Sequence, residues 1–240
     1  MKYLFVGDVH NHMYMFDDVE RLDKHYNFDK IVFVGDYVDD WMTDNHHSLK
    51  TLDKVISLKR ANPDKYIFTL GNHELSYLGY KCAGHKYELE DVVELKLKEN
   101  IDCFDIYAEV LCGENTFICS HAGFSNDFIN KLLDGIDGWK DVLAGDILKK
   151  LYLLSLCSYT RGGASPFGSC LWTDRKEHLY YNRYEKPLLS HQIIGHTPVE
   201  KIMFNDSFIF IDTHSTYRDG TPFGIKSYLV WDDNKFVEEI

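Results

Sequence analysis

The chain has 240 residues, of which 45% are hydrophobic and 27% are charged, a composition typical of a globular protein with a substantial core. Its formal net charge is −12 and no basic run occurs, so we expect neither a nucleic-acid polymer nor a membrane as a partner, since both require a cationic surface. The start of the chain reads as a strand rather than a signal peptide, and its six cysteines form no Cys-x-x-Cys pair, so we expect a cytoplasmic protein with reduced thiols.

Strands and helices alternate in the first third of the chain. Runs of β-branched and aromatic residues predict strands over residues 2–6, 30–34 and 66–70. Apolar spacing predicts helices over about residues 13–24 and 48–60, the second with Ser48 as its N-cap. This alternation predicts βαβ units, in which right-handed crossovers join parallel strands.

The remaining two thirds read as helical regions separated by strands. We expect helical structure over residues 76–100 and 126–157, the second interrupted near residues 135–138, and a long irregular loop over residues 161–168. The predicted strands lie at residues 104–111, 116–120, 191–195, 201–204, 208–212 and 225–231. No repeat, linker or low-complexity tract occurs, so we expect a single domain over residues 1–240.

Polar residues that can bind metal follow five of the predicted strands directly. Open α/β sheets form ligand-binding crevices at the carboxyl ends of their strands. One such loop is more often a turn or a helix cap, but five of them favour a common site. The candidate ligands are Asp8, His10, Asp36, Asn72, His121 and His196.

These ligands form a mixed oxygen and nitrogen set without a thiolate, which suits two divalent metal ions about 3.5–4 Å apart. Asp36 has two carboxylate oxygens and can bridge both ions. We expect Mn²⁺, with Fe or Zn as alternatives. Such a pair activates water for in-line attack on a phosphoryl group.

A catalytic pair is predicted beside these ligands. His73 follows Asn72 directly and is placed to protonate the leaving alkoxide. Asp39 lies three residues after Asp36 and can orient the imidazole and keep it charged.

The five stretches at residues 7–10, 35–39, 71–74, 120–123 and 195–198 resemble, in order, the signature blocks of calcineurin-like metallophosphoesterases. They are most similar to the phosphoprotein-phosphatase branch, which includes phage and bacterial serine/threonine phosphatases and symmetrical dinucleoside-tetraphosphatases. The resemblance implies an α/β fold of two packed mixed β-sheets flanked by helices, an αββα sandwich. It also implies that one ion is held by Asp8, His10 and Asp36, and the other by Asp36, Asn72, His121 and His196.

The second block departs from the family pattern, which continues as Asp-Arg-Gly with the arginine bound to the substrate phosphate. Here Asp40 and Trp41 follow Asp39, so this guanidinium is missing. A bidentate arginine is the natural phosphate ligand, so we expect Arg161, which two glycines follow, to replace it, with Arg175 as the second candidate. The alternative for either arginine is a surface or structural role.

Two further histidines stand next to the blocks. We expect His12 to be a surface or supporting residue, and we leave His214 without a role as a ligand.

The predicted function is hydrolysis of phosphate monoesters, most like that of a serine/threonine protein phosphatase. The alternative is a hydrolase of dinucleoside polyphosphates (Ap4A type) or of other small phosphate compounds, since the missing arginine weakens the phosphoprotein assignment. A third reading, a catalytically silent metal-binding regulatory module, is opposed by the retention of His73, Asp39 and all six ligands. The expected partner is therefore a phosphorylated protein, a small phosphate ester or a nucleotide.

Overall fold

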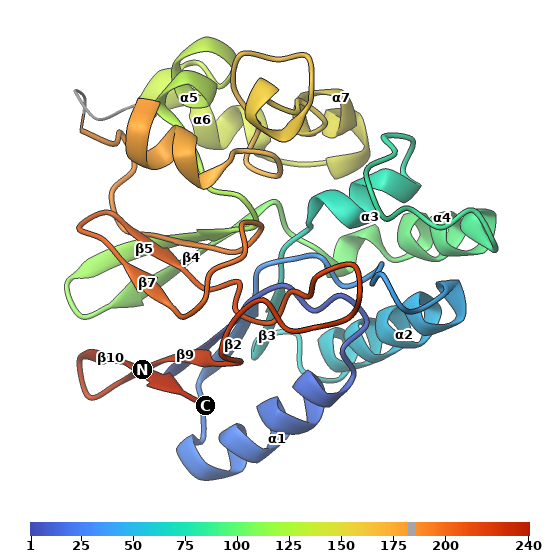
Figure 1. Cartoon of the computed structure of the whole chain (residues 1–240). Coiled ribbons are helices and arrows are strands. Elements are labelled where there is room, and N and C mark those ends of the chain that lie inside the picture. The colour runs from blue at the N-terminus through green and yellow to red at the C-terminus, as the bar shows by residue number, and fades with distance from the viewer. Residues whose placement is uncertain (182–185) are drawn as a thin grey trace.

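The computed structural model of the chain describes residues 1–181 and 186–240. It contains two five-stranded sheets that lie near each other and are flanked by helices (Figure 1). Both sheets mix parallel and antiparallel strands, which confirms the expected α/β architecture of two mixed sheets.

The first sheet has the strand order β10-β9-β1-β2-β3. Its members are β1 (Tyr3–Val6), β2 (Lys30–Phe33), β3 (Tyr66–Phe68), β9 (Tyr228–Asp232) and β10 (Lys235–Glu239). The three N-terminal strands are parallel, as the βαβ pattern predicts. All four residues of β1 are buried, because both faces of a central parallel strand are covered.

The second sheet has the strand order β4-β5-β6-β8-β7. Its members are β4 (Tyr107–Cys112), β5 (Asn115–Ser120), β6 (Gln192–Ile194), β7 (Met203–Phe204) and β8 (Phe208–Phe210). Its central strands β5, β6 and β8 are parallel, whereas β4 and β7 run antiparallel at the two edges.

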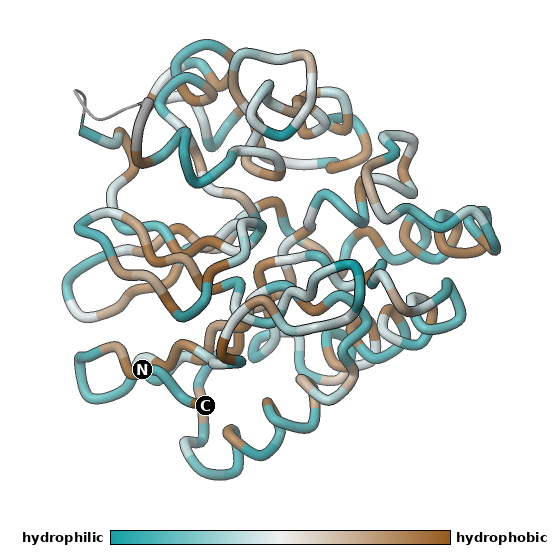
Figure 2. Tube along the Cα trace, in the orientation of Figure 1, coloured by the Kyte–Doolittle hydropathy of each residue, from teal (hydrophilic) through white to brown (hydrophobic). Residues whose placement is uncertain are grey.

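A hydrophobic layer joins the two sheets. Alternate residues of the first sheet, such as Phe5 and Val32, pack in one buried cluster with Cys119, Ile193 and Ile209 of the second sheet. The intervening residues point to the opposite face, as the two-residue period of strands requires, and pack against helices. Figure 2 shows hydrophobic residues gathered on the strands and hydrophilic ones on the peripheral turns.

Helices of varied length connect these strands. The α-helices are α1 (Tyr14–Tyr26), α2 (Asn45–Ala61), α3 (Asn72–Tyr77), α4 (Glu90–Glu99), α5 (Asn126–Leu132), α6 (Gly135–Leu143) and α7 (Leu151–Leu154). Short 3-10 turns are η1 (Ile101–Cys103), η2 (Ile147–Lys150) and η3 (Tyr159–Arg161), and η4 (Glu177–Tyr181) is a π-helical turn. Within residues 1–181 and 186–240, no helix is both long and apolar enough to span a membrane.

The start of α2 differs from the prediction. The N-cap is Asp44, whose carboxylate accepts hydrogen bonds from the backbone N–H groups of His46 and His47. Ser48 lies inside the helix and is fully buried, and its hydroxyl accepts hydrogen bonds from Asn11 Nδ2 and from the N–H of Asp39. Ser48 therefore supports the loop after β2 instead of capping the helix.

Two predicted helical regions are broken in the structure. Between α3 and α4 the chain forms a loop in which Gly79 and Gly84 have φ of +107° and +92°, values that favour glycine and end a helix. The region from residue 126 to 157 is divided into several short helices, and a break before α6 occurs at Asp134, with φ of +58°.

Strand β10 was not predicted. Its sequence is partly exposed and mostly polar, so it lacks the hydrophobic alternation that marks a strand. It pairs with β9 through a tight turn in which Asp233 and Asn234 both have positive φ, the backbone of a two-residue hairpin.

Candidate metal centre and active site

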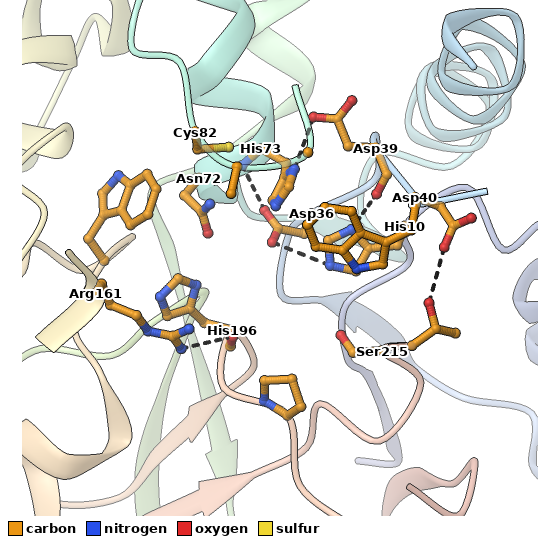
Figure 3. Close-up of a pocket in the computed structure, with 16 residues that line it drawn as sticks. His10, Asp36, Asp39, Asp40, Asn72, His73, Cys82, Arg161, His196 and Ser215 are labelled. Carbon is orange, nitrogen blue, oxygen red and sulfur yellow. Dashed lines mark hydrogen bonds and ion pairs between the residues drawn. The ribbon is translucent and has the colours of Figure 1, made fainter. Parts of the chain in front are cut away.

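The predicted ligands meet where the strands of both sheets end. The loops after β1, β2 and β3 carry Asp8, His10, Asp36 and Asn72, and those after β5 and β6 carry His121 and His196. A pocket of about 310 Å³ lies at this point (Figure 3). His10, Asp36, Asn72 and His196 line this pocket, whereas Asp8 and His121 are almost fully buried.

One group of four ligand atoms is centred on His121. Its Nε2 lies 2.8 Å from Asn72 Oδ1, 2.9 Å from His196 Nδ1 and 3.3 Å from Asp36 Oδ2. Its Nδ1 donates a hydrogen bond to Val34 O at 2.9 Å, which assigns the tautomer and leaves a lone pair on Nε2. Four lone-pair atoms facing one another are the arrangement that a metal cation requires, so these residues fit a divalent ion.

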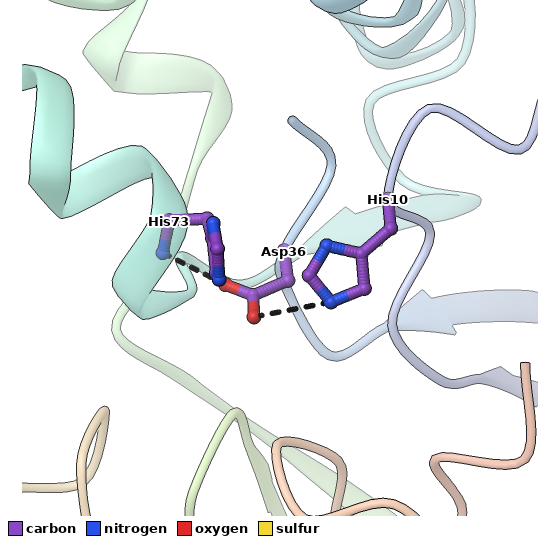
Figure 4. A group of neighbouring side chains, drawn as sticks. All are labelled: His10, Asp36 and His73. Atoms are coloured by element: carbon purple, nitrogen blue, oxygen red, sulfur yellow. Dashed lines mark hydrogen bonds and ion pairs between the residues drawn. The ribbon is translucent and has the colours of Figure 1, made fainter. Parts of the chain in front are cut away.

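A second group lies on the other side of Asp36. His10 Nε2 is 3.7 Å from Asp36 Oδ2 and 3.9 Å from Asp8 Oδ2. His10 Nδ1 donates to Asp39 O at 2.7 Å, so its Nε2 is the nitrogen available to a metal. Asp36 Oδ2 is thus near a ligand nitrogen of each group. Figure 4 shows the Asp36 carboxylate between His10 and His73.

Several buried acids lie close together at this point. Burial, together with the charges of Asp212 and Asp36, raises the pKa of Asp8 well above its usual range. Burial also opposes ionisation of Asp36, but the nearby His121 and His73 outweigh it and hold the pKa of Asp36 well below its usual range. Since burial lowers the pKa of His10 and of His196, both imidazoles are neutral, which is the form that binds metal.

The backbone of the site is locally strained. His10, Asp36, Asp39 and His196 have φ of 43°, 52°, 61° and 62°, in the left-handed region that non-glycine residues rarely adopt. Such conformations cost about 1–3 kcal/mol each and persist where the surrounding structure fixes them, commonly at functional sites.

Two glycines allow these loops to approach closely. A Cβ atom on Gly71 would lie 2.1 Å from Asp36 Oδ1, and one on Gly195 would lie 2.2 Å from Asp8 Oδ1. Each glycine precedes a predicted ligand, Asn72 or His196, so the missing side chain is what lets one ligand loop contact another.

Glu74 joins two of the loops and was not predicted as part of the site. Its fully buried carboxylate accepts hydrogen bonds from the backbone N–H groups of Asp36, Tyr37, Val38 and Gly71, at 2.7–3.1 Å. The signal was available, because Glu three residues after a possible N-cap is the pattern of a capping box.

The predicted catalytic pair is formed in the structure. His73 Nδ1 lies 2.9 Å from Asp39 Oδ2, and the N–H of His73 donates to Asp36 Oδ1 at 2.9 Å. Burial alone would lower the pKa of His73, but the negative charge of Asp36 and the bond to Asp39 raise it well above its usual value. Tyr77, which was not predicted, donates to the other Asp39 oxygen at 2.5 Å.

Asp212 is a further buried acid beside the ligands. It is fully buried, and its carboxylate accepts hydrogen bonds from the N–H and the hydroxyl of Ser215 at 3.2 and 2.9 Å. Burial raises the pKa of Asp212. Asp212 follows strand β8 closely, as the potential ligands follow the other strands. The sequence predicted a strand over residues 208–212, so Asp212 was placed inside the strand and was not recognised as a strand-end acid.

Arg161 lines the pocket, and its guanidinium is held from two sides (Figure 3). Nη2 donates to His196 O at 3.1 Å and to Thr197 Oγ1 at 2.6 Å, and Nε lies 2.9 Å from Asp174 Oδ2. Arg175 is not among the described residues that line the pocket, and its backbone N–H donates to Thr197 Oγ1 at 3.4 Å.

Asp40 occupies the pocket wall where the resemblance places an arginine. Its Oδ1 lies 3.7 Å from His12 Nε2 and accepts a hydrogen bond from Thr216 Oγ1 at 3.2 Å. Burial would raise the pKa of Asp40, but the bonds from His12 and from Met42 N–H lower it to about 2. Asp40 is therefore ionised and is held by His12 and Thr216. Through this contact with Asp40, His12 supports the pocket wall.

His214 lies outside the described residues that line the pocket. It is buried, its Nε2 donates to Ser227 O at 3.1 Å, and its Nδ1 is 3.2 Å from the hydroxyl of Tyr14. These contacts give it a structural role.

Comparison with known proteins agrees with this arrangement. The family model described as calcineurin-like phosphoesterase matches residues 1–200. A cold-active protein-tyrosine phosphatase from a psychrophilic Shewanella species is 16% identical, with a TM-score of 0.57 over 99% of this chain and 77% of that one. A protein serine/threonine phosphatase from Saccharomyces cerevisiae is also 16% identical, with a TM-score of 0.59 over 100% of this chain and 79% of that one. At this identity the two structures establish a shared fold.

Proposed function

The chain belongs to the calcineurin-like phosphoesterase family, and from this premise we propose that it hydrolyses phosphate monoesters with two divalent metal ions, most like a serine/threonine protein phosphatase. The observation that carries the proposal is the position of Asp36, whose Oδ2 lies 3.3 Å from His121 Nε2 and 3.7 Å from His10 Nε2, so that one carboxylate can serve both groups of potential ligands.

We assign the ligands as the sequence suggests, with one ion at Asp8, His10 and Asp36, and the other at Asp36, Asn72, His121 and His196. The absence of sulfur from this set favours Mn²⁺, with Fe or Zn as alternatives. Bound divalent ions supply Lewis-acid activation of water and of the phosphoryl group.

The chain's own residues bind the ester and move a proton. Arg161, fixed by Asp174, His196 and Thr197, is oriented to receive the phosphate through Nη1, since its described contacts engage Nε and Nη2. His73 gives its proton to the leaving oxygen of the ester. Asp39 holds the imidazole in its charged form, because a carboxylate 2.9 Å from Nδ1 favours the imidazolium.

A second candidate function is hydrolysis of dinucleoside polyphosphates. Two tryptophans, Trp41 and Trp172, line the same pocket as the predicted metal ligands. Indole rings stack well on nucleobases, and this would suit a nucleotide substrate.

A substrate panel tests these proposals. The full chain is treated with a chelator, reloaded with Mn²⁺, Zn²⁺ or Fe²⁺, and assayed with a phosphoserine or phosphothreonine peptide, nitrophenyl phosphate and diadenosine tetraphosphate. We expect Mn²⁺ to restore the highest activity and the phosphopeptide to have the highest kcat/KM. A preference for diadenosine tetraphosphate would favour the second candidate, and inactivity of every reloaded form on every substrate would reject both.

A further inference from the structure

A third group of potential metal ligands lies beside the proposed metal centre. Asp39, His73 and Cys82 each offer one ligand atom, and these three atoms lie within 4.8 Å of one another. We propose that this group is an inhibitory site for a thiophilic divalent cation of the Zn²⁺ type. The inhibitory effect rests on the proposed function, since two of the ligands are the proposed catalytic pair.

The loop between α3 and α4 holds Cys82 against the His73 ring (Figure 3). A Cβ atom on Gly84 would lie only 3.2 Å from His73 Cε1, so the loop backbone is packed directly on the imidazole. His85, in the same loop, is anchored by Ser76 Oγ at 2.9 Å and by Glu90 Oε2 at 2.8 Å. The thiol of Cys82 is thus presented to the pocket by a loop with fixed contacts.

The three ligand types distinguish this group from the main centre. A thiolate, an imidazole and a carboxylate form a set that Zn²⁺ binds well, and three protein ligands leave a fourth position open. The main centre combines only oxygen and nitrogen ligands, which suits harder ions. We therefore expect a thiophilic ion to bind at the Cys82 group while the main centre holds Mn²⁺.

Binding at this group would stop the proposed proton transfer. His73 Nδ1 and Asp39 Oδ2 are 2.9 Å apart and share a proton. A cation bound by both displaces that proton to solvent, and the thiol proton of Cys82 is likewise released to solvent when sulfur binds as the thiolate. His73 then lacks the charge it needs as a general acid.

Cysteine variants allow the site to be tested in the full chain. Cys82→Ser removes the sulfur ligand. The matched control is Cys157→Ser, because Cys157 is also a half-buried thiol, but its sulfur faces the backbone carbonyls of Ser158 and Arg161 at 3.8 Å. Both variants are compared with the unmodified chain after loading with Mn²⁺.

The first measurement is Zn²⁺ inhibition, with each protein normalised to its own activity without Zn²⁺. We expect Cys82→Ser to raise the half-inhibitory Zn²⁺ concentration by roughly tenfold or more, since a lost ligand weakens metal affinity strongly, and Cys157→Ser to leave it unchanged. Equal inhibition of all three proteins would overturn the inhibitory role.

The second measurement needs no substrate. Co²⁺, a spectroscopic substitute for Zn²⁺, is titrated into the three Mn²⁺-loaded proteins. We expect a thiolate-to-metal absorption band in the near ultraviolet for the unmodified chain and Cys157→Ser, and none for Cys82→Ser. A band that persists in Cys82→Ser, or is missing from the unmodified chain, would overturn the site itself. If the band appears as expected but no phosphate ester is hydrolysed, the cation site stands and the proposed function fails.

Discussion

The two oxygens of the Asp39 carboxylate have different partners. One is hydrogen-bonded to His73 and the other to Tyr77. These two bonds fix the Asp39 carboxylate, so the orientation of His73 depends on both Asp39 and Tyr77. Tyr77 is held in turn by Asn45, whose amide bonds to two backbone carbonyls. At the residue scale, catalytic geometry thus rests on a short chain of side chains.

Replacing His73 tests its role as the acid. We expect His73→Asn to lower kcat by ~10²–10⁴, since general acid catalysis contributes about that factor, while metal content stays unchanged. Elemental analysis of the purified variant measures the bound metal. Unchanged turnover of the phosphopeptide would contradict the role of His73 as the general acid.

The two arginines form a matched pair of variants. We expect Arg161→Ala to lower kcat/KM by roughly 10–100-fold, because a charge-assisted bond to phosphate contributes about 1.5–3 kcal/mol. Arg175→Ala should have little effect, since Arg175 lies outside the described pocket lining. The opposite pattern in steady-state kinetics would exchange their assignments.

At the scale of elements, the site depends on how closely the strand-end loops pack. Glu74 ties the loop after β2 to the start of α3 through four backbone N–H groups, and Gly71 and Gly195 remove the side chains that would keep the loops apart. Loop packing, rather than any single ligand, therefore sets the spacing between ligands.

The variant Gly195→Ala isolates this packing. The added Cβ would overlap Asp8 Oδ1 at 2.2 Å, so we expect Asp8 to shift and metal affinity to fall by about 10–100-fold. The control is Gly138→Ala in α6, where the added Cβ would lie 2.8 Å from Asp134 Cβ and also force a local shift, but against no proposed metal ligand. Metal titration by calorimetry compares the two, and equal affinities would contradict the packing argument.

The sequence predicted the parts of this arrangement that depend on local pattern. Strands ending in Gly-Asp, Gly-Asn, Ser-His or Gly-His predicted the loops that meet at the pocket, because strand ends and potential metal ligands both have short-range signals. The capping-box spacing of Glu74 is a local signal, but its bonds to the loop after β2 join segments far apart in the chain, which no local pattern encodes. Strand β10 was missed because its strand conformation comes from pairing with β9, and Asp212 was missed because the predicted strand over residues 208–212 included it.

At the scale of the whole molecule, the proposed metal centre connects the two sheets. The first sheet supplies Asp8, His10, Asp36 and Asn72, and the second supplies His121 and His196. Bound cations would act as a link between the sheets and would also neutralise the buried acids. Metal should therefore stabilise the entire fold, and the expected single domain over residues 1–240 should unfold in one transition.

Chelation tests this link. With metal at about 100 times its dissociation constant, binding stabilises the folded state by about 2.7 kcal/mol. For a chain of this size this corresponds to a Tm increase of about 5–11 °C over the chelated form. Asp36→Asn, which weakens both ligand groups, should lose most of this shift in calorimetry. A chelated protein with an unchanged Tm would show that the sheets hold together without the ions.

The hydrogen bond from Arg161 to the carbonyl oxygen of His196 has a consequence for turnover. If Arg161 holds phosphate as proposed, the anion and one metal ligand are anchored to the same peptide unit. If the bound anion raises the affinity for the cation through this turn, reciprocity of coupled binding requires the cation to raise the affinity for the anion by the same factor. Metal ions would dissociate mainly from the protein that has no anion bound. A steady supply of phosphate ester or of product phosphate would keep the metal ions bound.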